Sequence, residues 1–245
     1  MSLKKITLLK EKIEDFNSYP FSLPFIQHMD QLDLEYPVTF FVGENGSGKS
    51  TLLEGIAYQC GFHTAGGSRQ NSYKLDQSES ALGNYLRLSW LPKLTNGFFL
   101  RAESFYNFAT HIDETEKIRS TEYSNYSGKS LHHRSHGESF LTLFTQKFAS
   151  ARGQSIYLLD EPEAALSPAR QLSLMRIIKD LSPRSQFIIA THSPILLGYP
   201  DAEIISFDQD QLQPIDYQDT DHYQITRRFL ENPKRILAEL FHDDD

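Results

Sequence analysis

The sequence predicts an α/β domain with a mostly parallel central sheet flanked by helices, an antiparallel β portion at the N-terminus and a small polar, helical insertion. Short runs rich in apolar, β-branched and aromatic residues are typical of strands, and they fall at 6–9, 37–42, 97–105, 156–159, 186–194 and 203–208. Segments with helical periodicity lie between them, at 49–60, 139–150 and 172–182. This alternation favours parallel strands joined by right-handed crossovers.

Composition narrows the class of protein. The chain has 245 residues, enough for one such domain, and a net charge of −8, which argues against a surface that is basic all over. Its single cysteine, Cys60, rules out a disulfide within the chain and fits a reducing compartment. No secretory leader is visible in 1–16, and no apolar run approaches the length needed to span a bilayer. We therefore expect a cytoplasmic protein that does not itself insert into a membrane.

The segment FFVGENGSGKSTLLEGIA, at 40–57, contains the pattern G-x-x-x-x-G-K-S between a predicted strand and a predicted helix. That context is the one in which a glycine-rich loop turns its N–H groups onto phosphate oxygens at a helix N-terminus. The lysine would reach the β- and γ-phosphates, and the serine hydroxyl would reach Mg²⁺. The predicted nucleotide-binding residues are Gly43, Glu44, Asn45, Gly46, Ser47, Gly48, Lys49, Ser50 and Thr51.

Two later strand ends carry polar residues that suit the same chemistry. In SIYLLDEPEAALS, Asp160 follows a buried strand, where it can hold Mg²⁺, and Glu161 is placed to activate an attacking water as a general base. His192 follows the strand FIIATHSP and could hydrogen-bond the γ-phosphate or that water. Parallel strands end at one edge, so we expect these residues to face the glycine-rich loop, with Lys49, Glu161 and His192 as the catalytic set.

The segment RSHGES, ending at 139, opens the predicted helix 139–150 and allows two interpretations. It can be an ordinary N-cap, with Ser135 or His136 before the first apolar turn. It can also be a second anion-binding helix N-terminus. One sheet has one crevice for one nucleotide, so a second such helix start would read a phosphate held by a second copy of the chain.

Taken in order, the glycine-rich loop, SHGES, LLDEPEAALS and ATHS resemble the ABC-type P-loop ATPase superfamily over about residues 35 to 195. The resemblance implies ATP sandwiched in a head-to-tail dimer. It implies a signature of Ser135, His136, Gly137 and Glu138 acting on the partner's nucleotide. It also implies Mg²⁺ held by Ser50 and Asp160, with Glu103 standing where the family has its Q-loop glutamine and joining the predicted metal set.

The chain departs from transporter-type members of that family. His136 replaces the first glycine of the transporter signature, Glu138 replaces its glutamine, and the D-loop at 164–167 lacks its aspartate. FLRAESF and SHGES are similar to those of small stand-alone bacterial ATPases of the DNA-repair and overcoming-lysogenization-defect type. The segment between Lys49 and Ser135 is too short for the long coiled-coil arm of chromosome ATPases, and it contains no heptad repeat.

We expect a single domain over 1–245, with an inserted segment at about 64–138 that carries the signature. Two C-terminal helices should lie within 215–241, broken at Asn232-Pro233, and the last residues should be disordered. An aromatic residue before the glycine-rich loop should stack on adenine, unless it packs in the core instead; the candidates are Phe16, Tyr19 and Phe21.

These features predict a soluble Mg-dependent ATPase that dimerises around ATP. One alternative is the nucleotide-binding subunit of an ABC transporter, driving a membrane partner. Another is an ATP-switched regulatory or defence module that acts on nucleic acid or a nuclease partner; a small-molecule kinase is disfavoured because no phosphoacceptor site is evident. The basic residues that could bind nucleic acid, or simply be solvated, are Arg69, Lys74, Lys129, His132, His133 and Arg134.

Overall fold

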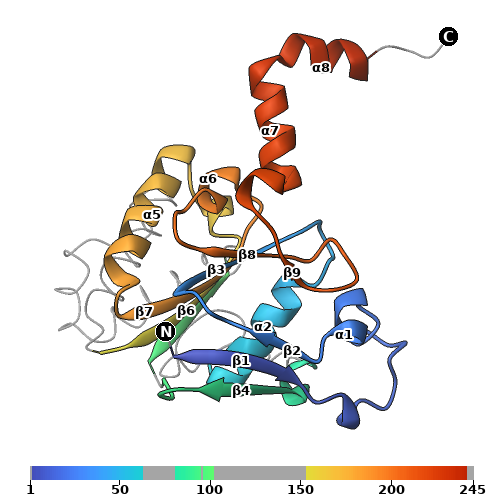
Figure 1. Cartoon of the computed structure of the whole chain (residues 1–245), viewed down its shortest axis with the longest axis vertical. Helices are drawn as coiled ribbons and strands as arrows, with labels where there is room; N and C mark the ends of the chain where they lie inside the picture. Colours follow the sequence, from blue (N-terminus) through green and yellow to red (C-terminus); the bar gives the residue numbers. More distant parts are fainter. Residues whose placement is uncertain (1, 63–80, 95, 102–152, 242–245) are drawn as a thin grey trace, which may run out of the picture.

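The computed structural model describes residues 2–62, 81–94, 96–101 and 153–241 (Figure 1). Several sequence predictions lie outside these residues. They are Glu103, the signature at 135–138, the helix at 139–150, most of the insertion at 64–138 and the six basic residues named above.

The central sheet has six strands in the order β5-β6-β7-β3-β8-β9. The first five are parallel, and β9 pairs antiparallel with β8. This confirms the predicted mostly parallel sheet. The strands are β3 (Val38–Val42), β5 (Gly97–Arg101), β6 (Ser155–Asp160), β7 (Ser185–Ala190), β8 (Glu203–Ser206) and β9 (Gln213–Pro214).

Both faces of the sheet are buried, so its strands read as continuous apolar runs. Neighbouring side chains point to opposite faces: Phe40 packs with α5 (Pro168–Leu181) and α6 (Pro194–Leu197), and Phe41 packs with α2 (Lys49–Cys60). Figure 1 shows α5 and α6 on one side of the sheet and α2 on the other. The domain is therefore layered, and the carboxyl ends of its parallel strands share one edge.

A smaller antiparallel sheet of order β2-β1-β4 covers α2 from outside and contributes to the same apolar cluster. Its strands are β1 (Leu3–Leu8), β2 (Gln31–Asp33) and β4 (Leu86–Trp90). The side chain of Gln186 in β7 ties it to the central sheet, accepting from the backbone N–H of Leu3 at 2.8 Å and donating to its carbonyl at 3.0 Å. The N-terminal β portion was predicted, although β1 begins before residue 6, and β2 and β4 were not foreseen.

Other boundaries also differ from the prediction. Helix α5 begins at Pro168 rather than 172, because proline is well suited to the first helical turn after Ser167. Helix α1 (Pro24–His28) was not foreseen, and it begins with proline in the same way. Short 3-10 turns lie at Lys10–Lys12, Gly83–Tyr85, Pro162–Ala165 and Tyr217–Asp219.

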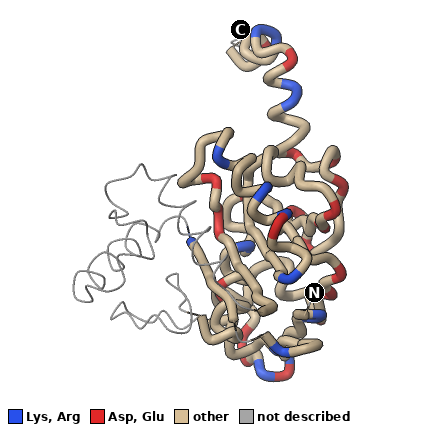
Figure 2. Tube along the Cα trace, turned by 90° about the vertical axis from the view of Figure 1, so that its left-hand side faces the viewer, with Lys and Arg blue, Asp and Glu red and all other residues tan. Residues whose placement is uncertain are grey.

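The two predicted C-terminal helices are present as α7 (Asp221–Glu231) and α8 (Pro233–Leu240). Asn232 ends the first and caps the second, accepting from the backbone N–H of Arg235 at 3.2 Å. Both helices project from the body of the domain and contain no buried residue (Figure 1). Acidic and basic positions are interspersed along them, as along the rest of the described chain (Figure 2). No helix within the described ranges has the length and apolar character needed to cross a membrane.

Candidate nucleotide site

The glycine-rich loop joins the end of β3 to the start of α2, as the sequence predicted. Gly46 and Gly48 have φ of 82° and 98°, a left-handed conformation that glycine adopts without steric cost. A Cβ on Gly48 would lie 2.5 Å from the Phe25 ring, so close packing also excludes a side chain there. The first N–H groups of α2 have no acceptor within the helix. The loop and helix start therefore form the kind of anion cradle that binds phosphate.

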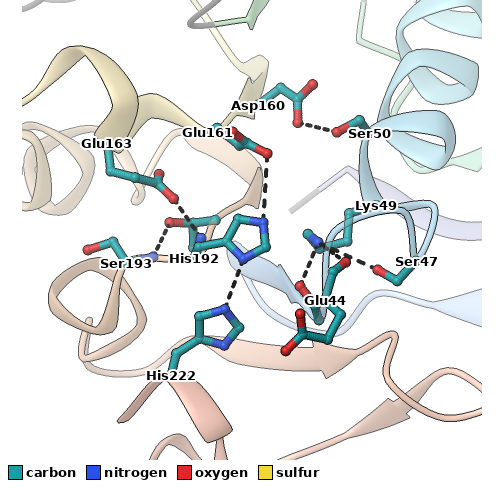
Figure 3. A network of polar contacts seen from close by, with 12 residues as sticks. Glu44, Ser47, Lys49, Ser50, Asp160, Glu161, Glu163, His192, Ser193 and His222 are labelled. Atoms are coloured by element: carbon teal, nitrogen blue, oxygen red, sulfur yellow. Dashed lines mark hydrogen bonds and ion pairs between the residues drawn. The ribbon is translucent and has the colours of Figure 1, made fainter. Parts of the chain in front are cut away.

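Lys49 is buried inside this loop. Its Nζ donates to the carbonyls of Gly43 at 2.6 Å and Glu44 at 2.9 Å, with the Ser47 Oγ at 3.5 Å (Figure 3). Burial lowers the pKa of Lys49, and nearby carboxylates, Glu161 foremost, oppose that shift. The ammonium group is thus held where a phosphate would enter the loop.

Ser50 and Asp160 meet at the same edge although they are far apart in sequence. The Ser50 hydroxyl donates to Asp160 Oδ1 at 2.8 Å, and the Arg101 Nε lies 3.3 Å from Oδ2. Burial raises the pKa of Asp160 to about 6, against the lowering effects of Ser50 and Arg101. A hydroxyl and a carboxylate side by side at a strand end fit Mg²⁺, which takes oxygen ligands and keeps several waters. Arg101 also pairs with Glu54.

A metal site built wholly from protein side chains is a separate possibility. No group of three or more histidine, cysteine, aspartate or glutamate side chains able to hold a metal ion occurs in the described part of the chain. A Mg²⁺ ion bound mainly through phosphates and water does not require such a cage. Glu103, the third residue of the predicted metal set, lies outside the described residues.

Glu161 turns away from the strand that precedes it. Its φ and ψ of 49° and 52° are left-handed, which is uncommon for a residue with a side chain. Its backbone N–H donates to the Ala190 carbonyl at 2.9 Å, and its side chain is 41% exposed. The carboxylate is therefore open to water, as a general base requires, and it points toward His192 (Figure 3).

His192 lies between β7 and α6, beside Glu161 (Figure 3). Its Nε2 is 3.7 Å from the Glu161 carboxylate, and its backbone N–H donates to the Glu163 carboxylate at 2.6 Å. Its Nδ1 is 2.9 Å from Nε2 of His222. Burial, followed by the charges of Lys49 and His222, lowers the pKa of His192, which favours the neutral ring at neutral pH.

Three residues at this edge were missed by the sequence analysis. Asp208, just after β8, fixes the loop by accepting from the backbone N–H of Glu44 at 2.7 Å. Its place at a strand end was a usable signal. Glu163 was another, as a third carboxylate within DEPE. His222 gave no signal, because only the packing of α7 brings it to the site.

The three aromatic candidates for adenine stacking separate in the structure. Phe21 packs edge-on against Tyr85 with centroids 4.7 Å apart, and Phe16 packs against the N-terminal apolar cluster. Tyr19 is 71% exposed, and its hydroxyl lies 2.8 Å from the Thr51 Oγ1 at the start of α2. Tyr19 therefore presents an accessible ring beside the cradle.

Comparison with known proteins gives one family match and a fold. Residues 135–198 match the family described as "AAA domain, putative AbiEii toxin, Type IV TA system". No curated protein matches the chain. A solved structure titled "An inward-facing conformation of a putative metal-chelate type ABC transporter" is 14% identical, with a TM-score of 0.52 and coverage of 92% of this chain and 88% of that one. This likeness shows the fold.

Two further structures overlap less closely. The SMC head domain from Thermotoga maritima is 17% identical, with a TM-score of 0.47 and coverage of 88% of this chain and 99% of that one. CbiO1 from Clostridium perfringens, part of the ABC transporter complex CbiONQ, is also 17% identical, with a TM-score of 0.49 and coverage of 86% and 91%.

Proposed function

We propose that the chain is a P-loop ATPase of the ABC type that binds Mg-ATP in the cradle at 43–51 and hydrolyses it; the family match over 135–198 and the likeness in fold support this proposal. The observation that carries the proposal is the convergence of Lys49, Ser50, Asp160, Glu161 and His192 at one strand edge. A glycine turn alone could arise for structural reasons, but five side chains with complementary roles in phosphoryl transfer point to one reaction.

In this proposal the loop N–H groups and Lys49 hold the β- and γ-phosphates. Ser50 and Asp160 would hold Mg²⁺, which when bound would neutralise the negative charge that develops during phosphoryl transfer. Tyr19 offers its exposed ring to adenine. Glu161 accepts the proton of the attacking water, and His192 donates a hydrogen bond toward the γ-phosphate side.

The proposal extends to a head-to-tail homodimer in which the signature at 135–138 of one chain would contact the nucleotide of the other. The support for this part is the resemblance in sequence. A transporter subunit and a nucleic-acid or nuclease-directed module would share the same nucleotide site and differ in the partner, so both remain predictions.

Substituting Glu161→Gln tests the chemistry. Removing the base while keeping the shape should lower ATP turnover by about 100-fold or more, because general-base catalysis contributes about 10²–10⁴. The Glu161→Gln variant should still bind ATP, as measured by calorimetry in the presence of Mg²⁺. As a matched control, Glu11→Gln on the exposed N-terminal turn should leave turnover unchanged. Equal turnover by wild type and Glu161→Gln would contradict the mechanism.

A further inference from the structure

The contact between His192 and His222 joins the nucleotide site to the projecting C-terminal helices. His222 is the second residue of α7, and its ring centroid is 5.0 Å from that of His192. The His192 Nδ1 and the His222 Nε2 are 2.9 Å apart, so one of them donates a proton and the other accepts it (Figure 3).

The direction of this hydrogen bond follows from the other side of the His192 ring. Its Nε2 is buried, has no hydrogen-bond partner among the described residues, and lies 3.7 Å from the Glu161 carboxylate. A lone pair on Nε2 would face that negative charge, whereas an N–H would be attracted to it. The favoured neutral tautomer therefore carries its proton on Nε2, its Nδ1 accepts, and His222 donates.

We propose that His222 is a positioning residue for His192. By donating from Nε2, it keeps His192 in the tautomer whose Nε2–H faces Glu161 and the phosphate side of the crevice. The role in hydrolysis rests on the proposed function, but the tautomer does not.

A second contact holds the turn before α7 against the start of α6, two residues after His192. The Tyr217 hydroxyl, just before α7, donates to the Pro194 carbonyl at 2.8 Å, and the Tyr217 ring packs on Tyr223 with centroids 4.6 Å apart. Thr220 caps the helix, accepting from the backbone N–H of Tyr223 at 3.3 Å. A displacement of α7 would therefore withdraw the donor from His192, so the helices that project from the domain are linked to the chemistry.

Three substitutions of His222 distinguish the effect of its hydrogen-bond donor from the effect of the size of its ring. In His222→Gln the side-chain amide can take the place of Nε2 and donate, whereas Phe keeps the ring without a donor and Asn is too short to reach. We expect His222→Gln to keep turnover within about threefold of wild type. We expect His222→Phe and His222→Asn to lose about 10- to 100-fold in kcat with little change in KM, by analogy with the loss seen when a metal-bound histidine is deprived of its hydrogen-bond partner. Gln224→Phe, an exposed position on the same helix, serves as the control.

The tautomer is read directly by nitrogen-15 NMR of the histidine rings, and this needs no turnover. Wild type and His222→Gln should show His192 protonated on Nε2. His222→Phe should show a mixture of both tautomers, because the Glu161 carboxylate alone then favours the proton on Nε2. Such a mixture in His222→Phe would support the positioning role even if wild type hydrolyses no ATP, a result that would overturn the proposed function alone. An unchanged tautomer in both His222→Phe and His222→Asn would overturn the inference.

Discussion

Two neighbouring carboxylates, Asp160 and Glu161, have opposite environments at the end of β6. Asp160 is buried, accepts from Ser50, and has a pKa raised to about 6. Glu161 leaves the strand in a left-handed conformation and is partly open to solvent. The backbone conformation of one residue thus gives the two carboxylates different surroundings, which suit the proposed metal-binding role of Asp160 and the proposed general-base role of Glu161.

The raised pKa of Asp160 predicts how stability depends on pH without metal. The unfolded chain gives up this proton near 3.8 and the folded chain near 6, so the folded state binds more protons in between. The contribution is therefore complete below about pH 4 and is lost as the pH rises through about 6. Denaturant unfolding in chelator at pH 4.5 and pH 7.5 should show a smaller decline for Asp160→Asn than for wild type, by an amount on the order of 2 kcal/mol.

Glu163, whose pKa burial also raises, should leave a residual pH dependence in the Asp160→Asn variant. Asp33→Asn, at an exposed ion pair on β2, is the matched control and should keep the wild-type profile. Parallel profiles for wild type and Asp160→Asn would show that burial of Asp160 does not set this dependence.

At the scale of elements, α5 and the pair α7–α8 are both amphipathic but differ in what covers them. Helix α5 buries Leu174, Ile178 and Leu181 against the central sheet. Helices α7 and α8 contain no fully buried residue in the described structure, and Leu240 is 70% exposed. Periodicity predicts a helix in each case, since the pattern is local. Whether the apolar face of a helix is packed depends on the tertiary structure, which the local pattern does not determine.

This difference predicts that a leucine-to-alanine substitution lowers the free energy of unfolding more in α5 than in α8. Leu174→Ala should lower the free energy of unfolding by about 2–5 kcal/mol, because it leaves a cavity beneath the sheet. Leu240→Ala should change it by no more than about 0.5 kcal/mol, because the side chain is already in water. Urea unfolding of both variants measures the two values. Comparable losses would mean that the apolar face of α8 is covered in solution.

For the molecule as a whole, the nucleotide edge is assembled from β3, β6, β7, β8 and the start of α7. The strands form the core, and the polar groups lie at or after their carboxyl ends and at the start of α7. The segment that would read a second nucleotide phosphate, 135–138, lies outside the described residues. The assembled state is therefore best tested in solution.

Light scattering of Glu161→Gln tests the proposed sandwich, because slow hydrolysis would let the closed state accumulate. We expect the mass of one 28.2 kDa chain without nucleotide and of two chains with Mg-ATP. Nucleotide buried between two chains favours association by mass action. Lys49→Ala should remain monomeric under both conditions. A single-chain mass with ATP bound would mean that SHGES is only a helix cap in this protein.

The sequence by itself determined the glycine-rich loop, the buried strands, the carboxylates after β6 and the break before Pro233, because each depends on neighbours within one element. Only the tertiary structure decided that Asp208 holds the loop, that Glu163 holds the His192 backbone and that His222 meets its ring. These contacts join segments far apart in the chain, and a single sequence contains no local period that encodes them. The short strands β2 and β4 were missed for the same reason, since their pairing with β1 stabilises them more than their own composition does.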